Sequence, residues 1–284
     1  KIRMCRHKQP VMKNSEMRDG KKSDLEFLVI TFETDSGLTA STFGFAGRGA
    51  LMAGEIANSI FKPFFLNKDP LYREKHWHEY RTADRWWNHA PIYSYGPFDI
   101  NCWLLSAMQA EQPLYKYLGA YRDTVPIYAS SLVLDSPEAY AKEALEYKKR
   151  GFNAYKLHPP GNYEFDLEAH KAVRKAVGNE FKLMSDPVAP YTFEQALRFG
   201  RELEKLNYYW YEEPLFDENF HGLRELTRIL DIPIIGTEVI AKHPYSVAEC
   251  ISTRVVDMVR ADVSWSGGIT ATMKTAHLAE SFGV

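Results

Sequence analysis

The sequence of 284 residues has few cysteines, no long apolar run and no marked excess of either charge. Cys5, Cys102 and Cys250 lie far apart and form no Cys-x-x-Cys pair, so neither a disulfide framework nor a cysteine-based zinc site is expected. No apolar stretch approaches the roughly 18 residues of a membrane helix, and the start of the sequence lacks the apolar segment of a signal peptide. We therefore expect a cytoplasmic protein without a membrane partner.

The charged side chains are dispersed and nearly balanced, with 35 Lys and Arg against 37 Asp and Glu. Proteins that bind nucleic acid concentrate Lys and Arg in a patch or stripe, so nucleic acid is not the expected partner. A hydrophobic content of 45% is typical of a globular protein with a large core. We expect a small-molecule ligand, and a homo-oligomer whose size the sequence does not reveal.

The first part of the chain has the pattern of an α+β domain. Residues 24–46 predict a β-hairpin, because apolar residues alternate along two arms on either side of a polar bend at 35–37. Helical patterns follow at about 51–65 and 100–118, and the second is ended by a glycine. These elements predict an α+β domain over residues 1–122.

From residue 123 the pattern changes to short apolar runs at near-even intervals, with helical stretches between them. Ser136 is placed to cap one of these helices, with Pro137 in its first turn, and Thr192 is placed to cap another. Six β-α units of about 25 to 30 residues predict parallel strands with right-handed crossovers. We expect an α/β fold over residues 123–284: a (β/α)8-type barrel, truncated after about six units, or else an open doubly wound sheet.

Ionisable side chains stand at the ends of five of the six apolar runs, where a barrel places its active site. In chain order these ends carry Lys156 and His158, Asp186, Glu212 and Glu213, Glu238, and Asp262. Buried charges without partners cost several kcal/mol, so the carboxylates are expected to share a cation. Asp186, Glu212 and Glu238 offer three oxygen ligands on neighbouring strands, which suits Mg²⁺. Strand alternation points Glu213 the other way, so we expect it to meet a helix or to cap one.

Lys156 and His158 stand two residues apart at the end of one run, so a strand would point both side chains to the same face. Imidazole titrates at about pH 6.5 and lysine at about pH 10.4, so a histidine can serve as a free base at neutral pH. The alternative is a histidine that is merely hydrogen-bonded at a strand end.

Several motifs together resemble the enolase superfamily, in particular its mandelate racemase and muconate-lactonising branch. They are YKLH at 155–158, WYEEPL at 210–215, GTE at 236–238 and ADVSWSGGIT at 261–270, and residues 93–130 resemble the end of the family's capping domain. The resemblance implies a capping domain on a (β/α)8 barrel, with Mg²⁺ held by Asp186, Glu212 and Glu238. It also implies that the metal and a lysine hold a substrate carboxylate while a base removes the adjacent proton.

The resemblance assigns further roles. Lys156 would neutralise the substrate carboxylate, and His158 takes the position where the family usually has its lysine base. Asp262 matches an aspartate that, in the family, hydrogen-bonds a histidine at the end of the next strand. Two further β-α units would need about 60 to 100 residues, so we expect the natural chain to continue past Val284 and its seventh strand to end in that histidine. Val188 stands where many relatives have asparagine.

The expected function is Mg²⁺-dependent removal of the proton α to a substrate carboxylate. The polar residues 13–23 are expected to form a lid, which favours a hydroxyl-rich substrate and hence an acid-sugar dehydratase. A racemase or epimerase of a 2-substituted carboxylic acid is the alternative. A non-catalytic carboxylate or metal-binding homologue is a hypothesis of another class.

Other residues give weaker signals. His76 and His78 lie in a stretch expected to be helical or irregular, where their spacing points them apart. His277 is expected at the surface of a helix or in ordinary packing, and His89 fits packing at least as well as a pocket. Residues 44–49 are glycine-rich without a following lysine, so we expect a mobile lid there and not a phosphate-binding loop.

Overall fold

The part of the chain that the structure describes contains two sheets of different kinds. The computed structural model describes residues 2–5, 27–45, 50–87, 90–239 and 241–284. Within these residues the strands are β1 (Ile2–Cys5), β2 (Phe27–Glu33), β3 (Thr39–Phe45), β4 (Ala129–Ser130), β5 (Ala154–Leu157), β6 (Lys182–Ser185), β7 (Trp210–Glu212), β8 (Ile234–Gly236) and β9 (Met258–Val259). The first three strands form an antiparallel sheet, and the other six form a parallel sheet hydrogen-bonded in chain order.

Helices surround both sheets. They are α1 (Ala50–Ile56), the π-helical turn η1 (Ala57–Phe61), α2 (Lys62–Phe65), α3 (Arg73–Trp87), α4 (Ile92–Gln109), α5 (Leu114–Tyr117), α6 (Pro137–Lys149), α7 (Tyr163–Val177), α8 (Phe193–Lys205), α9 (Phe220–Ile229), α10 (Pro244–Ser252) and α11 (Gly268–Phe282). In the described part of the chain, no helix combines the length and the apolar character that crossing a bilayer demands.

The antiparallel sheet contains the predicted hairpin and one strand that was not predicted. The hairpin is confirmed: β2 pairs with β3, and Gly37 has a φ of 86°, a left-handed conformation that glycine adopts without strain. The unpredicted strand, β1, pairs with the other edge of β2. Leu28 and Ile30 on β2 are buried in an apolar cluster with Phe61 and Phe98 from the helices.

One of the two helices predicted in this half has the wrong bounds. The stretch predicted at 51–65 is helical throughout, as α1, η1 and α2. The helix predicted at 100–118 is instead two helices, of which α4 begins earlier, at Ile92, and ends at Gln109. Pro113 explains the break, because proline has no N–H to donate in a helix interior, and it directly precedes α5. The lid expected at 13–23 lies outside the described residues.

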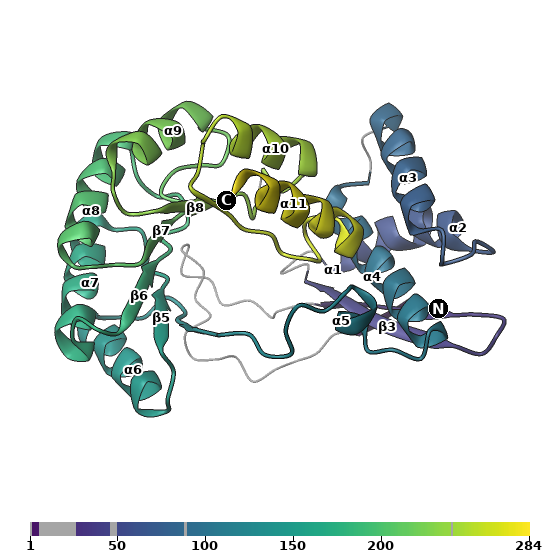
Figure 1. Ribbon diagram of the computed structural model, residues 1–284, viewed down its shortest axis with the longest axis horizontal. Helices are drawn as coiled ribbons and strands as arrows, with labels where there is room; N and C mark the ends of the chain where they lie inside the picture. The colour runs from purple at the N-terminus through teal and green to yellow at the C-terminus, as the bar shows by residue number, and fades with distance from the viewer. Residues whose placement is uncertain (1, 6–26, 46–49, 88–89, 240) are drawn as a thin grey trace.

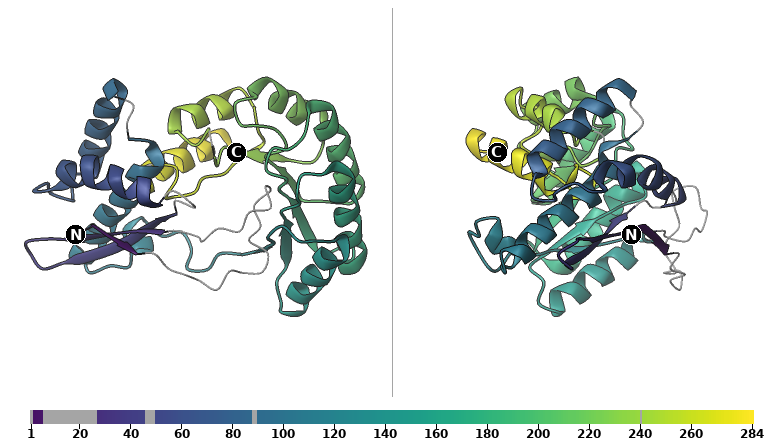
Figure 2. Two further views of the ribbon diagram at one scale, coloured as in Figure 1. Left: turned by 180° about the vertical axis from the view of Figure 1, so that it is seen from behind. Right: turned by 90° about the vertical axis from the view of Figure 1, so that its right-hand side faces the viewer.

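The six parallel strands confirm the predicted β-α repeats. Helices α6 to α9 cover the outer side of the sheet (Figure 1), and the view from behind shows the same layering (Figure 2). The predicted caps are confirmed: the Ser136 side chain accepts a hydrogen bond from the Ala139 N–H, and Thr192 forms a reciprocal capping box with Gln195. The main apolar core lies between this sheet and its helices.

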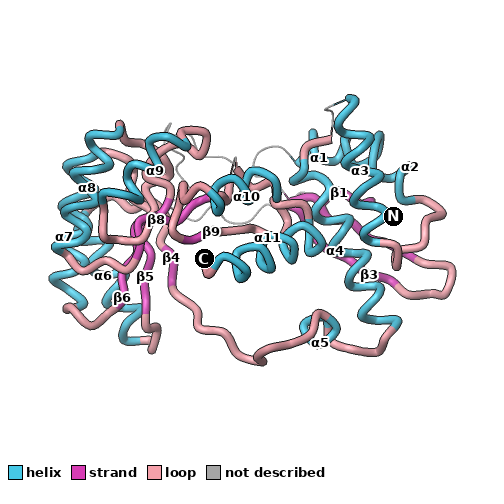
Figure 3. The backbone as a smooth tube through the Cα atoms, turned by 45° about the horizontal axis from the view of Figure 1, so that its top comes forward, coloured by secondary structure: helices cyan, strands magenta, loops and turns pink. Residues whose placement is uncertain are grey.

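Helix α11 packs against α4, so it connects the two halves of the molecule. Asp99 on α4 is fully buried and accepts hydrogen bonds from the Thr270 N–H at 2.9 Å and the Thr270 hydroxyl at 2.7 Å. A Cβ added to Gly96 would lie 1.9 Å from the carbonyl oxygen of Ser264. The loop after β9 is therefore pressed onto α4. The boundary predicted after residue 122 falls in the extended connection between α5 and β4 (Figure 3), and it stays a prediction.

Candidate active site

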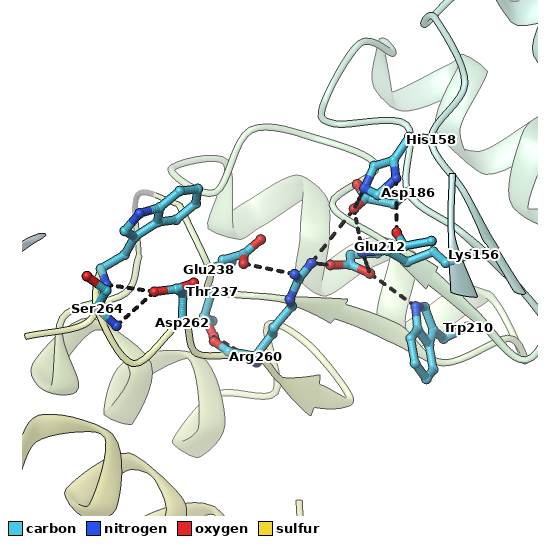
Figure 4. A network of polar contacts seen from close by, with 12 residues as sticks. Lys156, His158, Asp186, Trp210, Glu212, Thr237, Glu238, Arg260, Asp262 and Ser264 are labelled. Atoms are coloured by element: carbon cyan, nitrogen blue, oxygen red, sulfur yellow. Dashed lines mark hydrogen bonds and ion pairs between the residues drawn. The ribbon is translucent and has the colours of Figure 1, made fainter. Parts of the chain in front are cut away.

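The residues predicted to form a site lie together at the C-terminal ends of the parallel strands (Figure 4). Lys156 and Glu212 belong to β5 and β7, and the remaining residues lie one to three positions after the strands. Those are His158, Asp186, Glu238 and Asp262, after β5, β6, β8 and β9 respectively. Parallel strands bring their carboxyl ends to one edge, which is why residues more than 100 positions apart in the chain meet here.

Lys156 joins two of the buried carboxylates. Its ammonium group donates to Asp186 Oδ2 at 2.8 Å and to Glu212 Oε2 at 2.9 Å. Lys156 is 1% exposed and Glu212 is fully buried. Trp210 adds a hydrogen bond from its indole N–H to Glu212 Oε2 at 3.2 Å. Each of these charges therefore has a partner, as burial requires.

His158 is held so that one particular nitrogen faces the site. Its Nδ1 lies 2.7 Å from the backbone carbonyl oxygen of Ser131, and a carbonyl can only accept, so Nδ1 carries a hydrogen. Nε2 lies 2.8 Å from Asp186 Oδ2. The backbone is fixed as well, because the His158 N–H donates to Ser131 Oγ and Tyr140 donates its hydroxyl to the His158 carbonyl. Nε2 is thus the nitrogen that can exchange a proton with a ligand.

The electrostatic environment differs between the carboxylates. Burial alone would raise the pKa of Asp186, but the hydrogen bond from His158 and the charge of Lys156 outweigh it and hold that pKa at about 2. Burial raises the pKa of Glu238 to about 7; Lys156 opposes this rise, and the charges of Asp186 and Asp262 add to it. An added cation near Glu238 would favour its charged form and oppose this rise.

Arg260, which the sequence analysis missed, is a further member of the site. One guanidinium nitrogen lies 2.8 Å from Glu238 Oε1, and the other contacts Glu212 Oε1 and lies 3.8 Å from Asp186 Oδ2. A single cationic group thus reaches all three predicted metal ligands (Figure 4). The three carboxylates converge on one small volume.

The donor atoms fit a hard divalent cation. Among the described residues, no three His, Cys, Asp or Glu side chains are already arranged as a metal cluster, and Lys156 and Arg260 contact the three carboxylates. However, Asp186 Oδ1 is buried and makes no hydrogen bond with any described residue. An unsatisfied carboxylate oxygen, beside two further carboxylates that meet at one cation, is the chemistry that Mg²⁺ requires.

Asp262 lies at the edge of this cluster. Its Oδ1 accepts hydrogen bonds from the backbone N–H groups of Ser264 at 2.8 Å and Trp265 at 2.9 Å, so its own loop holds it. Figure 4 shows its carboxylate close to Thr237 and Glu238. Its role in an acid/base pair stays a prediction.

Glu213 departs from what strand alternation predicts. Its φ is 41°, so the backbone leaves the extended conformation of β7 at this residue. The backbone of Glu238 hydrogen-bonds its carboxyl group, and burial together with the charge of Asp217 raises its pKa to about 8. Glu213 thus belongs to the acidic side of the site, and its expected contact with a helix stays a prediction.

The weaker candidates lie away from the site. His76 is buried on α3, where its Nε2 bonds to the Asp69 carbonyl at 2.7 Å, whereas His78 on the same helix is exposed. His277 is exposed on α11, as predicted. Val188 has a φ of 58° and a 44% exposed side chain. His89 and residues 46–49 lie outside the described residues.

A parallel β-α sheet with carboxylates, a lysine and a histidine at its carboxyl edge, beside an α+β half, defines a barrel-type enzyme scaffold. The sequence pattern described as "Enolase C-terminal domain-like" matches residues 139–284, and the chain belongs to this family. The predicted membership of the enolase superfamily and the barrel-type fold are confirmed.

Individual relatives carry different activities. The chain is 32% identical to arabinonate dehydratase from Saccharolobus solfataricus over 79% of this chain and 61% of that protein. It is 28% identical to hydrophobic dipeptide epimerase from Enterococcus faecalis over 90% of this chain and 72% of that protein. A crystal structure of D-glucarate dehydratase from Agrobacterium tumefaciens complexed with magnesium has a TM-score of 0.84 and 32% identity, and covers 93% of this chain and 72% of that one. The chain spans about three fifths of the arabinonate dehydratase.

Proposed function

We propose that the protein is a Mg²⁺-dependent enzyme that removes the proton α to a substrate carboxylate, which leaves an enediolate. The observation that most supports this is the convergence of Asp186, Glu212 and Glu238 beside Lys156 and His158. The three carboxylates would hold Mg²⁺, which would neutralise negative charge that develops on the substrate carboxylate. The magnesium in the related D-glucarate dehydratase supports this cofactor.

In this proposal His158 is the base and Lys156 the fixed positive charge. The Ser131 carbonyl keeps a hydrogen on Nδ1 of His158, so the lone pair of the neutral ring is on Nε2, which faces the site. Contact with Asp186 requires a proton on that same nitrogen. His158 is therefore free to take a substrate proton only when another cation satisfies Asp186. Lys156 lies between two buried carboxylates, and its ammonium group would attract the substrate carboxylate.

The substrate class that we propose is a sugar acid, with loss of water after proton removal. The similarity to arabinonate dehydratase supports this choice. Epimerisation is the second candidate, supported by the similarity to the dipeptide epimerase, and it would require a second acid/base group. The cytoplasmic location and the homo-oligomer stay predictions.

Titration calorimetry with Mg²⁺ tests the metal site. Glu212→Gln keeps the shape of the side chain but removes its charge, so Mg²⁺ should bind at least tenfold more weakly than to the wild type. Glu225→Gln removes a carboxylate that pairs with Arg228 on the surface of α9, and it should leave the affinity unchanged. Equal affinities for the wild type and Glu212→Gln would contradict the ligand assignment.

A screen of aldonic and aldaric acids in deuterated solvent tests the reaction. A dehydratase forms a 2-keto-3-deoxy acid from its substrate, whereas an epimerase exchanges the α-proton for deuterium without forming that product. His158→Gln should lose both signals if His158 is the base. If no acid in the screen incorporates deuterium or forms product, a non-catalytic carboxylate binder becomes the better hypothesis.

A further inference from the structure

Arg260 occupies the point at which the three carboxylates meet. Its two terminal nitrogens divide the contacts, one with Glu238 and the other with Glu212 and Asp186. The planar fork of a guanidinium suits this task, because it presents several donors in fixed directions to more than one carboxylate. In this arrangement a side chain fills the place that a divalent cation would take.

The backbone of Arg260 is fixed by hydrogen bonds, whereas its side chain is partly exposed to solvent. Its N–H donates to the carbonyl of Gly236 at 2.8 Å, and its carbonyl accepts from the Thr237 hydroxyl at 2.9 Å. The side chain is 29% exposed, in contrast to the 1% exposure of the Lys156 side chain. A change of rotamer can therefore move the guanidinium toward solvent without movement of β9, whereas the buried side chain of Lys156 has no such access to solvent.

The charges around the three carboxylates indicate which side-chain cation a metal ion would displace. Lys156 contacts Asp186 and Glu212, and Arg260 contacts Glu212 and Glu238 and lies 3.8 Å from Asp186, so side-chain cations already face all three carboxylates. A divalent ion would then meet a guanidinium within a few ångströms, in surroundings where like charges repel strongly. Arg260 is both the most exposed of these cations and the one that touches all three carboxylates.

We propose that Arg260 is an internal competitor for the divalent cation. In the metal-free protein its guanidinium holds the carboxylates together, and metal binding displaces it toward solvent. The inference rests on the proposed function, because it takes the three carboxylates as the metal ligands. It predicts a protein that is stable without metal and binds the metal more weakly than the carboxylates alone would allow.

The test compares Mg²⁺ binding and metal-free stability in Arg260→Met, which keeps an unbranched side chain without the charge. We expect calorimetry to show Mg²⁺ binding to this variant about tenfold or more tightly than to the wild type. In EDTA its melting temperature should be lower than that of the wild type, because the carboxylates have lost a counter-ion. Arg254→Met is the matched control: this 81% exposed arginine pairs only loosely with Asp257, at 3.5 Å, so neither quantity should change.

The outcomes separate this inference from the proposed function. Equal or weaker Mg²⁺ affinity in folded Arg260→Met, with tight binding by the wild type, overturns the competitor role and leaves the metal site intact. Absence of Mg²⁺ binding in both proteins overturns both proposals. If Arg260→Met does not fold in EDTA, Arg260→Lys replaces it. Its single ammonium cannot span the carboxylates, so Mg²⁺ affinity should still rise, by less than for methionine, and an unchanged affinity contradicts the role.

Discussion

Lys156→Met should strongly destabilise the metal-free protein, because it removes the cation that two buried carboxylates share. Methionine has a similar length, so little cavity is created and the electrostatic effect dominates. The ammonium lies 2.8 Å from Asp186 and 2.9 Å from Glu212, and these residues are 4% and 0% exposed. Removal of one partner from a buried ion pair costs about 3–5 kcal/mol. We expect the free energy of unfolding in EDTA to fall by that amount.

Urea denaturation followed by circular dichroism measures this difference. Lys171→Met provides a matched control, because Lys171 makes a solvent-exposed pair with Glu168 at 3.2 Å, and such pairs contribute about 0–1 kcal/mol. Mg²⁺ at about 100 times its dissociation constant should raise the free energy of unfolding by about 2.7 kcal/mol, because it binds only the folded protein.

A decrease of less than about 1 kcal/mol in the free energy of unfolding of Lys156→Met in EDTA would refute the reasoning, because exposed surface ion pairs contribute that little. The double variant Lys156→Met/Glu212→Gln provides a second check. Glutamine removes the charge that the lysine neutralises, so the double variant should lose less stability than the sum of the two single losses. Strict additivity would mean that the two side chains do not interact as an ion pair.

Further predictions concern the contact between the halves and the core. Burial raises the pKa of Asp99 to about 7 despite the hydrogen bonds from Thr270, so the folded state holds a proton that the unfolded chain loses near pH 4. The free energy of unfolding should therefore fall as pH rises from about 4 to 7, and urea titrations of Asp99→Asn should lack that slope. Burial lowers the pKa of His170 to about 4, so its contribution to the free energy of unfolding should be fully present above about pH 6.5 and fall by up to about 3 kcal/mol as pH drops to 4. His170→Gln should remove this loss, and an acid titration that is unchanged in the variant would contradict the assignment. Gly96→Ala places a Cβ 1.9 Å from the Ser264 carbonyl oxygen and should cost about 1–3 kcal/mol, seen as a lower melting temperature; an unchanged one would mean that the contact relaxes freely.

The repeated elements could be predicted because their signals are local. Ser136 and Thr192 are polar residues directly before helical patterns, and each caps the expected helix. Apolar runs that end in ionisable residues indicated strand ends, and parallel pairing then brought Asp186, Glu212 and Glu238 to one edge. The family signal in residues 139–284 agrees with these local patterns.

The features that were missed depend on three-dimensional context. Strand alternation does not predict that Glu213 lies near Asp186 and Glu238, because its backbone leaves the extended region at that residue and no sequence rule gives the change of φ. Arg260 follows an apolar run two residues before Asp262, and this position could have identified it as a strand-end residue. Without the positions of the carboxylates, however, it resembles any solvated arginine. Pro113 was a readable signal for the break after α4.

The position of Asp262 depends on the other half of the molecule in a way that no local pattern contains. Its carboxylate bonds to the backbone of the loop after β9, and the same loop is pressed against α4 at Gly96. Asp99 and Thr270, which are 171 residues apart, hydrogen-bond behind that loop. Any change that loosens α4 from α11 should therefore shift Asp262 relative to Glu238, while Lys156 and the other strand-borne groups stay in place. The α+β half therefore contacts the loop that holds Asp262, through Gly96 on α4.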